Sequence, residues 1–239
     1  MDAHVWAMCF SATGSFGVAA ALAGIGAYSV AQDKLPSHKM LAVVPLLFAG
    51  QQVAEGVVWM TLDRASPGWV KTVAVAVFLG FALIIWPTWV PLSLLRAETN
   101  PRRRQMLSFL ACVGIGVAIC ASVILIRGQP TAHVEGHRMA YSYTDLGSRT
   151  VQALYLPTYI VPALIPFFVS TLSWAKIMGG VLAVTLVATF IIERTTLTSV
   201  WCFSAAILSG VIVMGIAAER RLTVALTTPE DARAMGDRA

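Results

Sequence analysis

Residues 106–126 read Met-Leu-Ser-Phe-Leu-Ala-Cys-Val-Gly-Ile-Gly-Val-Ala-Ile-Cys-Ala-Ser-Val-Ile-Leu-Ile and contain no charged side chain. Three arginines, Arg102–Arg104, stand just before this stretch, and Arg127 follows it directly. One helical crossing of a bilayer core about 30 Å thick takes about 20 consecutive apolar residues. The stretch therefore predicts a transmembrane helix with basic residues at both ends.

The whole chain has the composition of an integral membrane protein. Of its 239 residues, 57% are hydrophobic and 12% are charged. A soluble domain usually carries about 25% charged residues, because its surface faces water. The backbone of a spanning segment must satisfy its own hydrogen bonds, since the bilayer core holds no water, and helices do this. The composition excludes a soluble globular domain and favours a helical one.

Seven stretches in total are apolar and long enough to cross a bilayer, and only Glu193–Thr196 separates the last two. We therefore predict an all-α, polytopic membrane protein of about seven helices. It forms one domain over residues 1–221, followed by a cytoplasmic tail over residues 222–239. A cleaved signal peptide is not expected, because the first apolar stretch is too long and lacks a basic region before it. The stretches are Phe10–Ala31, Met40–Leu62, Thr72–Leu95, Met106–Ile126, Thr150–Val169, Ile177–Ile192 and Leu197–Ala217.

The distribution of lysine and arginine predicts the orientation. The arginines at 102–104 and the pair Arg220-Arg221 outweigh the basic residues of the opposite loops. Because short loops rich in Lys and Arg stay inside, the N-terminus is expected outside and the C-terminus in the cytoplasm. The net charge of +5 then calls for no nucleic-acid partner, and anionic membrane lipids are the expected contacts.

The second apolar stretch contains Gln51-Gln52-Val-Ala-Glu55-Gly-Val-Val-Trp59. Gln51, Gln52, Glu55 and Trp59 stand three, four or seven residues apart, which places them on one helix face. An ionisable group at membrane depth is costly, so it marks a functional site by default. Glu55 is the candidate general acid, and the two glutamines and Trp59 are candidate substrate-binding residues. The alternative is that the polar groups only join helices by hydrogen bonds.

Three other predicted helices begin with polar or aromatic residues at the depth of Glu55. They are expected to complete an outward-facing pocket whose floor is Glu55. Alternatively, these residues are ordinary helix caps and interfacial aromatic belts. The substrate-binding candidates among them are Ser11, Thr13, Tyr155, Tyr159, Thr198 and Trp201.

Two further segments carry unusual residues. Pro87 and Pro91 are predicted to kink the third helix, either for packing or as a hinge. The longest loop, Arg127–Arg149, contains His133 and His137, which could share a metal ion if the segment were helical. A polar lid over the pocket is the preferred interpretation of this loop, and no metal site or cofactor is assigned.

Met8-Cys9-Phe10-Ser11-Ala12-Thr13 and the later Gln51-Gln52-x-x-Glu55-Gly-x-x-Trp59 resemble the motifs of an uncharacterised bacterial family. Its members are small multi-pass membrane proteins, catalogued as a domain of unknown function. In that family a histidine often occupies the position of Gln51, and Trp201-Cys202 also looks like its last helix. Because residues 1–7 precede the family-like start, Met8 is a candidate initiator. The resemblance implies the architecture but supplies no activity.

The architecture is also similar to that of small seven-helix membrane terpene cyclases, which carry an essential acid on a Trp-containing second helix. By this analogy, we expect Glu55 to catalyse an acid-dependent transformation of an amphipathic or isoprenoid-type substrate. Two other classes of function stay open. One is a proton-coupled transporter or channel for a small solute. The other is a structural or assembly subunit that binds a partner protein through its polar stripe.

Overall fold

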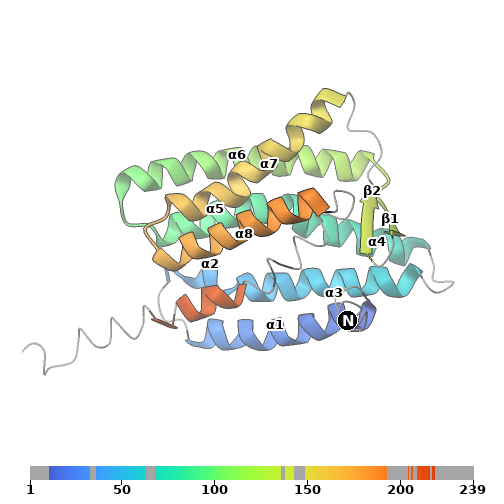
Figure 1. Ribbon diagram of the computed structural model, residues 1–239, viewed down its shortest axis with the longest axis horizontal. Helices are drawn as coiled ribbons and strands as arrows, with labels where there is room; N and C mark the ends of the chain where they lie inside the picture. Colours follow the sequence, from blue (N-terminus) through green and yellow to red (C-terminus); the bar gives the residue numbers. More distant parts are fainter. Residues whose placement is uncertain are drawn as a thin grey trace, which may run out of the picture.

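The computed structural model describes residues 11–32, 36–62, 68–135, 138–142, 149–192, 204, 206, 209–215 and 217–218. Helices dominate this part of the chain and run back and forth along one axis (Figure 1). The elements are α1 (Ala12–Gln32), α2 (Lys39–Ala42), α3 (Val44–Leu62), α4 (Gly68–Gly80), the π-helical turn η1 (Phe81–Ile85), α5 (Trp86–Ala97), α6 (Pro101–Arg127), β1 (Thr131–Glu135), β2 (Arg138–Ser142), α7 (Arg149–Val169) and α8 (Ser173–Ile192).

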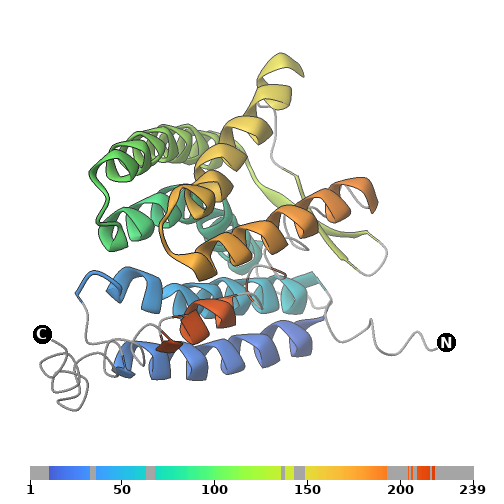
Figure 2. The same cartoon turned by 60° about the vertical axis from the view of Figure 1, so that its left-hand side comes forward.

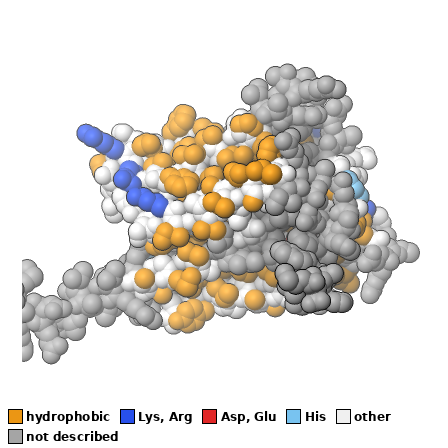
Figure 3. Space-filling model, in the orientation of Figure 1, with side chains coloured by type: hydrophobic (Ala, Val, Ile, Leu, Met, Phe, Trp, Pro, Cys, Tyr) orange, Lys and Arg blue, Asp and Glu red, His pale blue; other side chains and the backbone are white. Residues whose placement is uncertain are grey.

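Five helical segments are long and apolar enough to cross a membrane, and they coincide with five of the seven predicted stretches. A shorter apolar helix covers Leu156–Val169 within the fifth stretch. The seventh, Leu197–Ala217, lies mostly outside the described residues. Hydrophobic side chains cover much of the visible face (Figure 3), as a lipid-facing surface requires. The five segments are Ala12–Gln32, Lys39–Leu62, Gly68–Ala97, Pro101–Arg127 and Ser173–Ile191.

The alternating directions of the segments create two different ends of the bundle (Figures 1 and 2). One end, which we name the basic end, carries the exposed side chains of Lys39, Arg96, Arg102 and Lys176. Lysine and arginine side chains gather there at the left of Figure 3. The opposite end, which we name the hairpin end, carries β1 and β2.

The segment expected to be a polar lid is an antiparallel hairpin whose register pairs His133 with Ala140. Met139 is fully buried, and the Tyr141 ring stacks on Phe78 of α4 with ring centroids 4.5 Å apart. The hairpin is thus anchored to the bundle by apolar contacts. His133 lies in a strand, so the helical spacing considered for a shared metal ion does not occur, and His137 lies outside the described residues.

Pro87 marks an irregularity in the third predicted stretch, where η1 joins α4 to α5. In a π-helical turn each carbonyl accepts a hydrogen bond from the backbone N–H five residues later in the chain. Proline has no backbone N–H, so Pro87 cannot donate in this way. The carbonyl of Ala82, five residues before Pro87, instead accepts a hydrogen bond of 2.7 Å from the Tyr159 hydroxyl. Tyr159 of α7 thereby satisfies a backbone group that the proline leaves open, and it joins two helices.

Helix α6 approaches the same region closely at Gly114. A Cβ atom at this position would lie 1.8 Å from the Pro87 carbonyl oxygen and 3.3 Å from the Pro162 Cβ. Small residues allow membrane helices to pack with their backbones close together. Gly114 therefore sets how near α6 lies to α5 and α7.

Glu98 joins the two turns at the basic end. It is 1% exposed, and its carboxylate accepts from the backbone N–H groups of Thr99, Asn100 and Thr171 and from the Thr171 hydroxyl, at 2.8–3.1 Å. Burial acts to raise the pKa of Glu98, but these hydrogen bonds outweigh it and hold the pKa below its ordinary value. The turn after α5 is thus fastened to the turn after α7.

Two of the three consecutive arginines cap helix ends in the same region. The Arg103 guanidinium donates to the carbonyls of Val169 and Ser170, where α7 ends. The Arg104 guanidinium donates to the carbonyls of Leu95 and Glu98, where α5 ends. A cation at a helix C-terminus satisfies open carbonyls and complements the helix dipole. These two arginines therefore stabilise helix ends, in addition to contributing to the lysine and arginine distribution that predicts the orientation.

Substituting Gly114→Ala should destabilise the bundle, because the new methyl group meets a backbone carbonyl that cannot move without shifting α5. We expect a loss of about 1–3 kcal/mol or more, the usual cost of overpacking, measured as a lower thermal unfolding temperature in detergent. Gly116→Ala is the matched control, since a Cβ there meets nothing within 4 Å. Equal melting temperatures of the two variants would contradict the close approach at Gly114.

Substituting Glu98→Gln should lower stability at neutral pH by about 2 kcal/mol, because hydrogen bonds to a charged group each contribute about 1.5–3 kcal/mol. The lowered pKa means that the charged form stabilises the fold above the ordinary pKa. This stabilisation is lost as the pH falls through the lowered value.

The difference in unfolding temperature between wild type and Glu98→Gln should therefore shrink below about pH 4.3. Thr171→Val, which removes one of the four donors, should cause a smaller loss. A difference that persists unchanged into strong acid would contradict the role of the Glu98 charge.

Candidate functional site

The polar residues of α3 lie inside the bundle, as their spacing predicts. Gln51 and Gln52 are fully buried and Glu55 is 3% exposed. The Gln52 side-chain N–H₂ donates to Glu55 Oε2 over 3.3 Å. Glu55 lies seven residues from the end of α3, which is about 10 Å at 1.5 Å per residue. A carboxyl group is thus buried within a segment long and apolar enough to cross a membrane, with an amide beside it.

Trp86 of α5 connects this polar group to the rest of the bundle. Its indole N–H donates to Gln51 Oε1 over 2.7 Å, and its ring stacks on Phe48 with centroids 3.9 Å apart. A second indole, of Trp89, donates to the Met40 carbonyl over 2.9 Å. Buried tryptophans usually find such a partner for the indole N–H. These contacts fasten α5 to α2 and α3.

Each of the two glutamines keeps one polar atom without a hydrogen-bond partner in the described part of the chain. These atoms are Gln51 Nε2, a donor, and Gln52 Oε1, an acceptor. A buried polar group left unsatisfied costs about 1–3 kcal/mol. Such groups are rare in native structures, and each one calls for an explanation. A donor and an acceptor on successive residues can together hold a polar group of a bound molecule.

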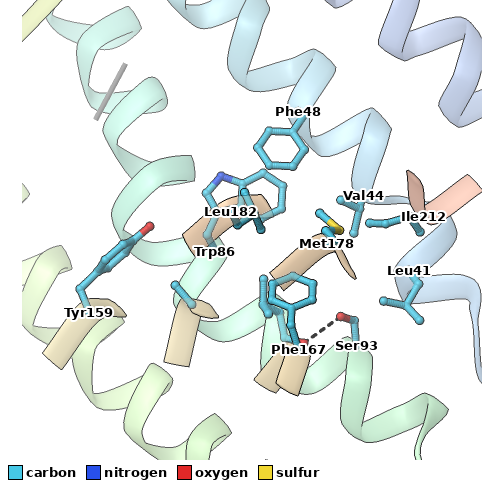
Figure 4. A pocket seen from close by; sticks show the side chains of 12 residues that line it. Leu41, Val44, Phe48, Trp86, Ser93, Tyr159, Phe167, Met178, Leu182 and Ile212 are labelled. Atoms are coloured by element: carbon cyan, nitrogen blue, oxygen red, sulfur yellow. Dashed lines mark hydrogen bonds between the residues drawn. The ribbon is translucent and has the colours of Figure 1, made fainter. Parts of the chain in front are cut away.

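A cavity of about 50 Å³ lies on the other side of the Phe48–Trp86 pair (Figure 4). Its wall is almost entirely apolar, and its polar side chains already have partners: the Ser93 hydroxyl donates to the Val90 carbonyl, and Tyr159 donates to Ala82. The lining residues are Leu41, Val44, Phe48, Trp86, Val90, Ser93, Tyr159, Ala163, Phe167, Met178, Leu182 and Ile212.

The cavity and the polar residues follow one face of α3. Val44 and Phe48 line the cavity, and Gln52 and Glu55 stand four and seven residues after Phe48, on the same side of the helix. The cavity therefore occupies the half of the bundle towards the basic end, and Glu55 lies towards the hairpin end, outside the cavity lining. The aromatic pair Phe48 and Trp86 stands between them.

The other predicted site residues have separate places. Tyr159 lines the cavity, with its hydroxyl bound to Ala82. The Ser11 hydroxyl accepts from the Gly14 N–H, as a helix cap does. Thr13 is exposed and Trp59 is half-buried. The side chains of Tyr155, Thr198 and Trp201 lie outside the described part of the structure.

Sequence reasoning missed Trp86 and Phe48 as parts of this region. In the sequence, Trp86 stands out only by its place before Pro87. The signal that could have identified it is the indole N–H at membrane depth, which needs an acceptor; Gln51 and Gln52 were the available amides. Phe48 carries no such signal, because an apolar residue in an apolar helix looks like any other.

Comparisons with known proteins identify the family and no activity. The model of a family of unknown function, DUF6629, matches residues 8–228. No curated protein and no solved structure matches the chain. The family match extends over both the polar stripe of α3 and the helices that line the cavity. With nearly its whole length matched, the chain is a member of DUF6629, a family of unknown function.

Proposed function

We propose that this protein binds an amphipathic or isoprenoid-type molecule inside the bilayer and that Glu55 acts on it as a general acid. The single observation that carries the proposal is the pair of unsatisfied amide atoms, Gln51 Nε2 and Gln52 Oε1, buried beside Glu55. Polar atoms in such a place find their use when a ligand group pairs with them. The apolar cavity on the same face of α3 suits the hydrocarbon part of the ligand.

The arrangement favours a ligand that lies along α3. Only a small part of its hydrocarbon would enter the cavity of about 50 Å³, and its reacting end would lie across the Phe48–Trp86 pair, beside Gln52 and Glu55. The aromatic rings of this pair, with Tyr159, would flank the path. Such rings stabilise positive charge that develops on a bound molecule.

Glu55 suits a proton transfer that needs no other reactant. The Glu55 carboxyl group is 3% exposed, and in the proposed reaction it would act in its protonated form. Its O–H would give the proton to a carbon–carbon double bond, leaving a carboxylate and a carbocation. Loss of a proton from a neighbouring carbon back to Glu55 would complete an isomerisation or a cyclisation with all atoms balanced.

We also propose the membrane topology expected from the sequence. A seventh helix within Leu197–Ala217, an N-terminus outside and a C-terminus in the cytoplasm of a bacterial inner membrane would place the basic end inside. The cavity would then open from the cytoplasmic half of the bilayer. Glu55 would lie in the outer half, across the aromatic pair from the cavity.

A transporter for a small polar solute is less well supported. Such a carrier needs polar groups along a route through the bundle, whereas the polar side chains of the cavity wall are already hydrogen-bonded within the described residues. No specific contact among the described residues supports the hypothesis of an assembly subunit either.

Substituting Glu55→Gln should abolish turnover and leave the fold intact, because the amide keeps the shape and cannot donate a proton as an acid does. General acid catalysis typically contributes about 10²–10⁴-fold, so a rate loss of that size is expected. Purified protein would be incubated with total bacterial lipid extract and with C15 to C20 prenyl compounds, and products would be followed by mass spectrometry.

Thr72→Ala is the control, since the exposed Thr72 hydroxyl donates to the Gly68 carbonyl within α4; its rate should equal that of wild type. Thermal unfolding of both variants checks the fold. A Glu55→Gln protein that forms product at the wild-type rate would contradict the acid role. A wild type that retains a molecule unchanged would limit the function to binding.

A further inference from the structure

We propose that Tyr159 is a positioning residue, whose hydroxyl sets the helical register before Trp86 and thereby holds the Trp86 indole against Gln51. The ring of Tyr159 lines the cavity, whereas this role belongs to the hydroxyl alone. Its consequence for turnover rests on the proposed function. The coupling of Tyr159 to Trp86 does not, because it concerns only hydrogen bonds between described residues.

The backbone before Trp86 is paired differently from that of an α-helix. In an α-helix the Ala82 carbonyl would accept from the Trp86 N–H, four residues later. Here the Trp86 N–H donates to the Phe81 carbonyl, five residues earlier. The Ala82 carbonyl accepts from the Tyr159 hydroxyl over 2.7 Å. The hydroxyl of α7 therefore stands in for the N–H of Trp86 at this carbonyl.

The Ala82 carbonyl depends on this hydroxyl for a donor. Ala82 is 1% exposed, and a buried carbonyl without a donor is costly, most of all where no water is present. The N–H of Trp86 could replace the hydroxyl only by leaving the Phe81 carbonyl and restoring α-helical pairing. Pro87, the next residue, has no N–H to donate. The Tyr159 hydroxyl thus stabilises the π-helical turn η1 against an α-helical one.

The turn η1 decides which side chain of this segment faces α3. Its extra residue displaces all later side chains by one position around the helix, about 100° at 3.6 residues per turn. With η1 in place, the Trp86 indole donates to Gln51 Oε1 over 2.7 Å. In an uninterrupted α-helix this place would fall to Ile85, whose side chain has no donor.

The indole in turn fixes how Gln51 presents its amide. An indole N–H is only a donor, so it binds the amide oxygen and leaves Gln51 Nε2 without a partner among the described residues. This nitrogen is one of the two atoms proposed to hold the ligand beside Glu55. The Tyr159 hydroxyl therefore acts on the site through Ala82 and Trp86. Such π-helical turns are frequent at functional sites.

The role is tested on Trp86 itself, in the full chain in detergent. The protein has seven tryptophans; after labelling with 5-fluorotryptophan, Trp86→Phe identifies the fluorine NMR signal of Trp86. Tyr159→Phe keeps the ring, removes the hydroxyl and should shift that signal. The Trp86 indole N–H should also exchange with solvent about tenfold faster, which corresponds to about 1.4 kcal/mol of lost protection. Tyr28→Phe, at an exposed tyrosine of α1, is the matched control and should change neither.

Restoring a donor at position 159 separates the hydrogen bond from general packing. Replacing Tyr159 by 4-aminophenylalanine puts an N–H₂ group in the place of the hydroxyl, and it should return the Trp86 signal and exchange rate to wild-type values. Unfolding temperatures check that each variant is folded. A Trp86 signal and exchange rate that Tyr159→Phe leaves unchanged would overturn the proposal. So would a wild-type Trp86 indole that exchanges as fast as that of the exposed Trp69.

Turnover separates the positioning role from the acid role of Glu55. With the C15 to C20 prenyl compounds as substrates, Tyr159→Phe should lower kcat by about 10–100-fold, because misplaced binding groups slow a reaction. A wild type without turnover, together with a Trp86 signal that moves in Tyr159→Phe, would overturn the acid role and support the positioning of Trp86. A moved Trp86 signal with a wild-type kcat would overturn the part of Tyr159 in the reaction.

Discussion

The hydrogen bond from the Trp86 indole to the Gln51 amide is the contact around which the centre of this bundle is organised. It joins α5 to α3 at 2.7 Å, and it brings the Trp86 ring onto Phe48. The apolar cavity begins on one side of that ring pair, and the buried group of Gln52 and Glu55 lies on the other. Without water in the bilayer core, an indole N–H and an amide must pair with each other or with a ligand. Each glutamine has one further polar atom, Gln51 Nε2 or Gln52 Oε1, that has no hydrogen-bond partner among the described residues. These two atoms are available to bind a ligand.

The same constraint explains how the bundle accepts proline. Pro87 removes a donor from the third spanning segment, and the chain responds with a π-helical turn whose freed carbonyl is taken by Tyr159. The close contact of Gly114 with the Pro87 carbonyl then brings α6 against the irregular turn. An element predicted as a kink or hinge is thus tied to two neighbouring helices, which favours packing as the role of these prolines.

Charges at the basic end fall into two sets with different physical roles. Glu98, Arg103 and Arg104 are paired with backbone groups and fasten the turns after α5 and α7. Lys39, Arg96 and Lys176 are exposed. The positive-inside pattern treats all of these cations alike, because it counts charges in loops. Their partners, which sequence counting does not reveal, separate the cations that fasten helix ends from those that are exposed.

By itself, the sequence predicted five helical segments that are long and apolar enough to cross a membrane, with bounds within a few residues of those in the structure, and the shared face of Gln51, Gln52 and Glu55. These follow from hydropathy and from the 3.6-residue repeat, which are local properties. Only the tertiary structure decided that Trp86 pairs with Gln51, that Glu98 joins two turns 73 residues apart, and that the cavity lies towards the basic end. The hairpin also escaped prediction, because its anchor Tyr141 stacks on Phe78, which lies on a helix distant in the sequence. Contacts between residues far apart in the chain depend on how helices are arranged, and a single sequence carries no direct record of that arrangement.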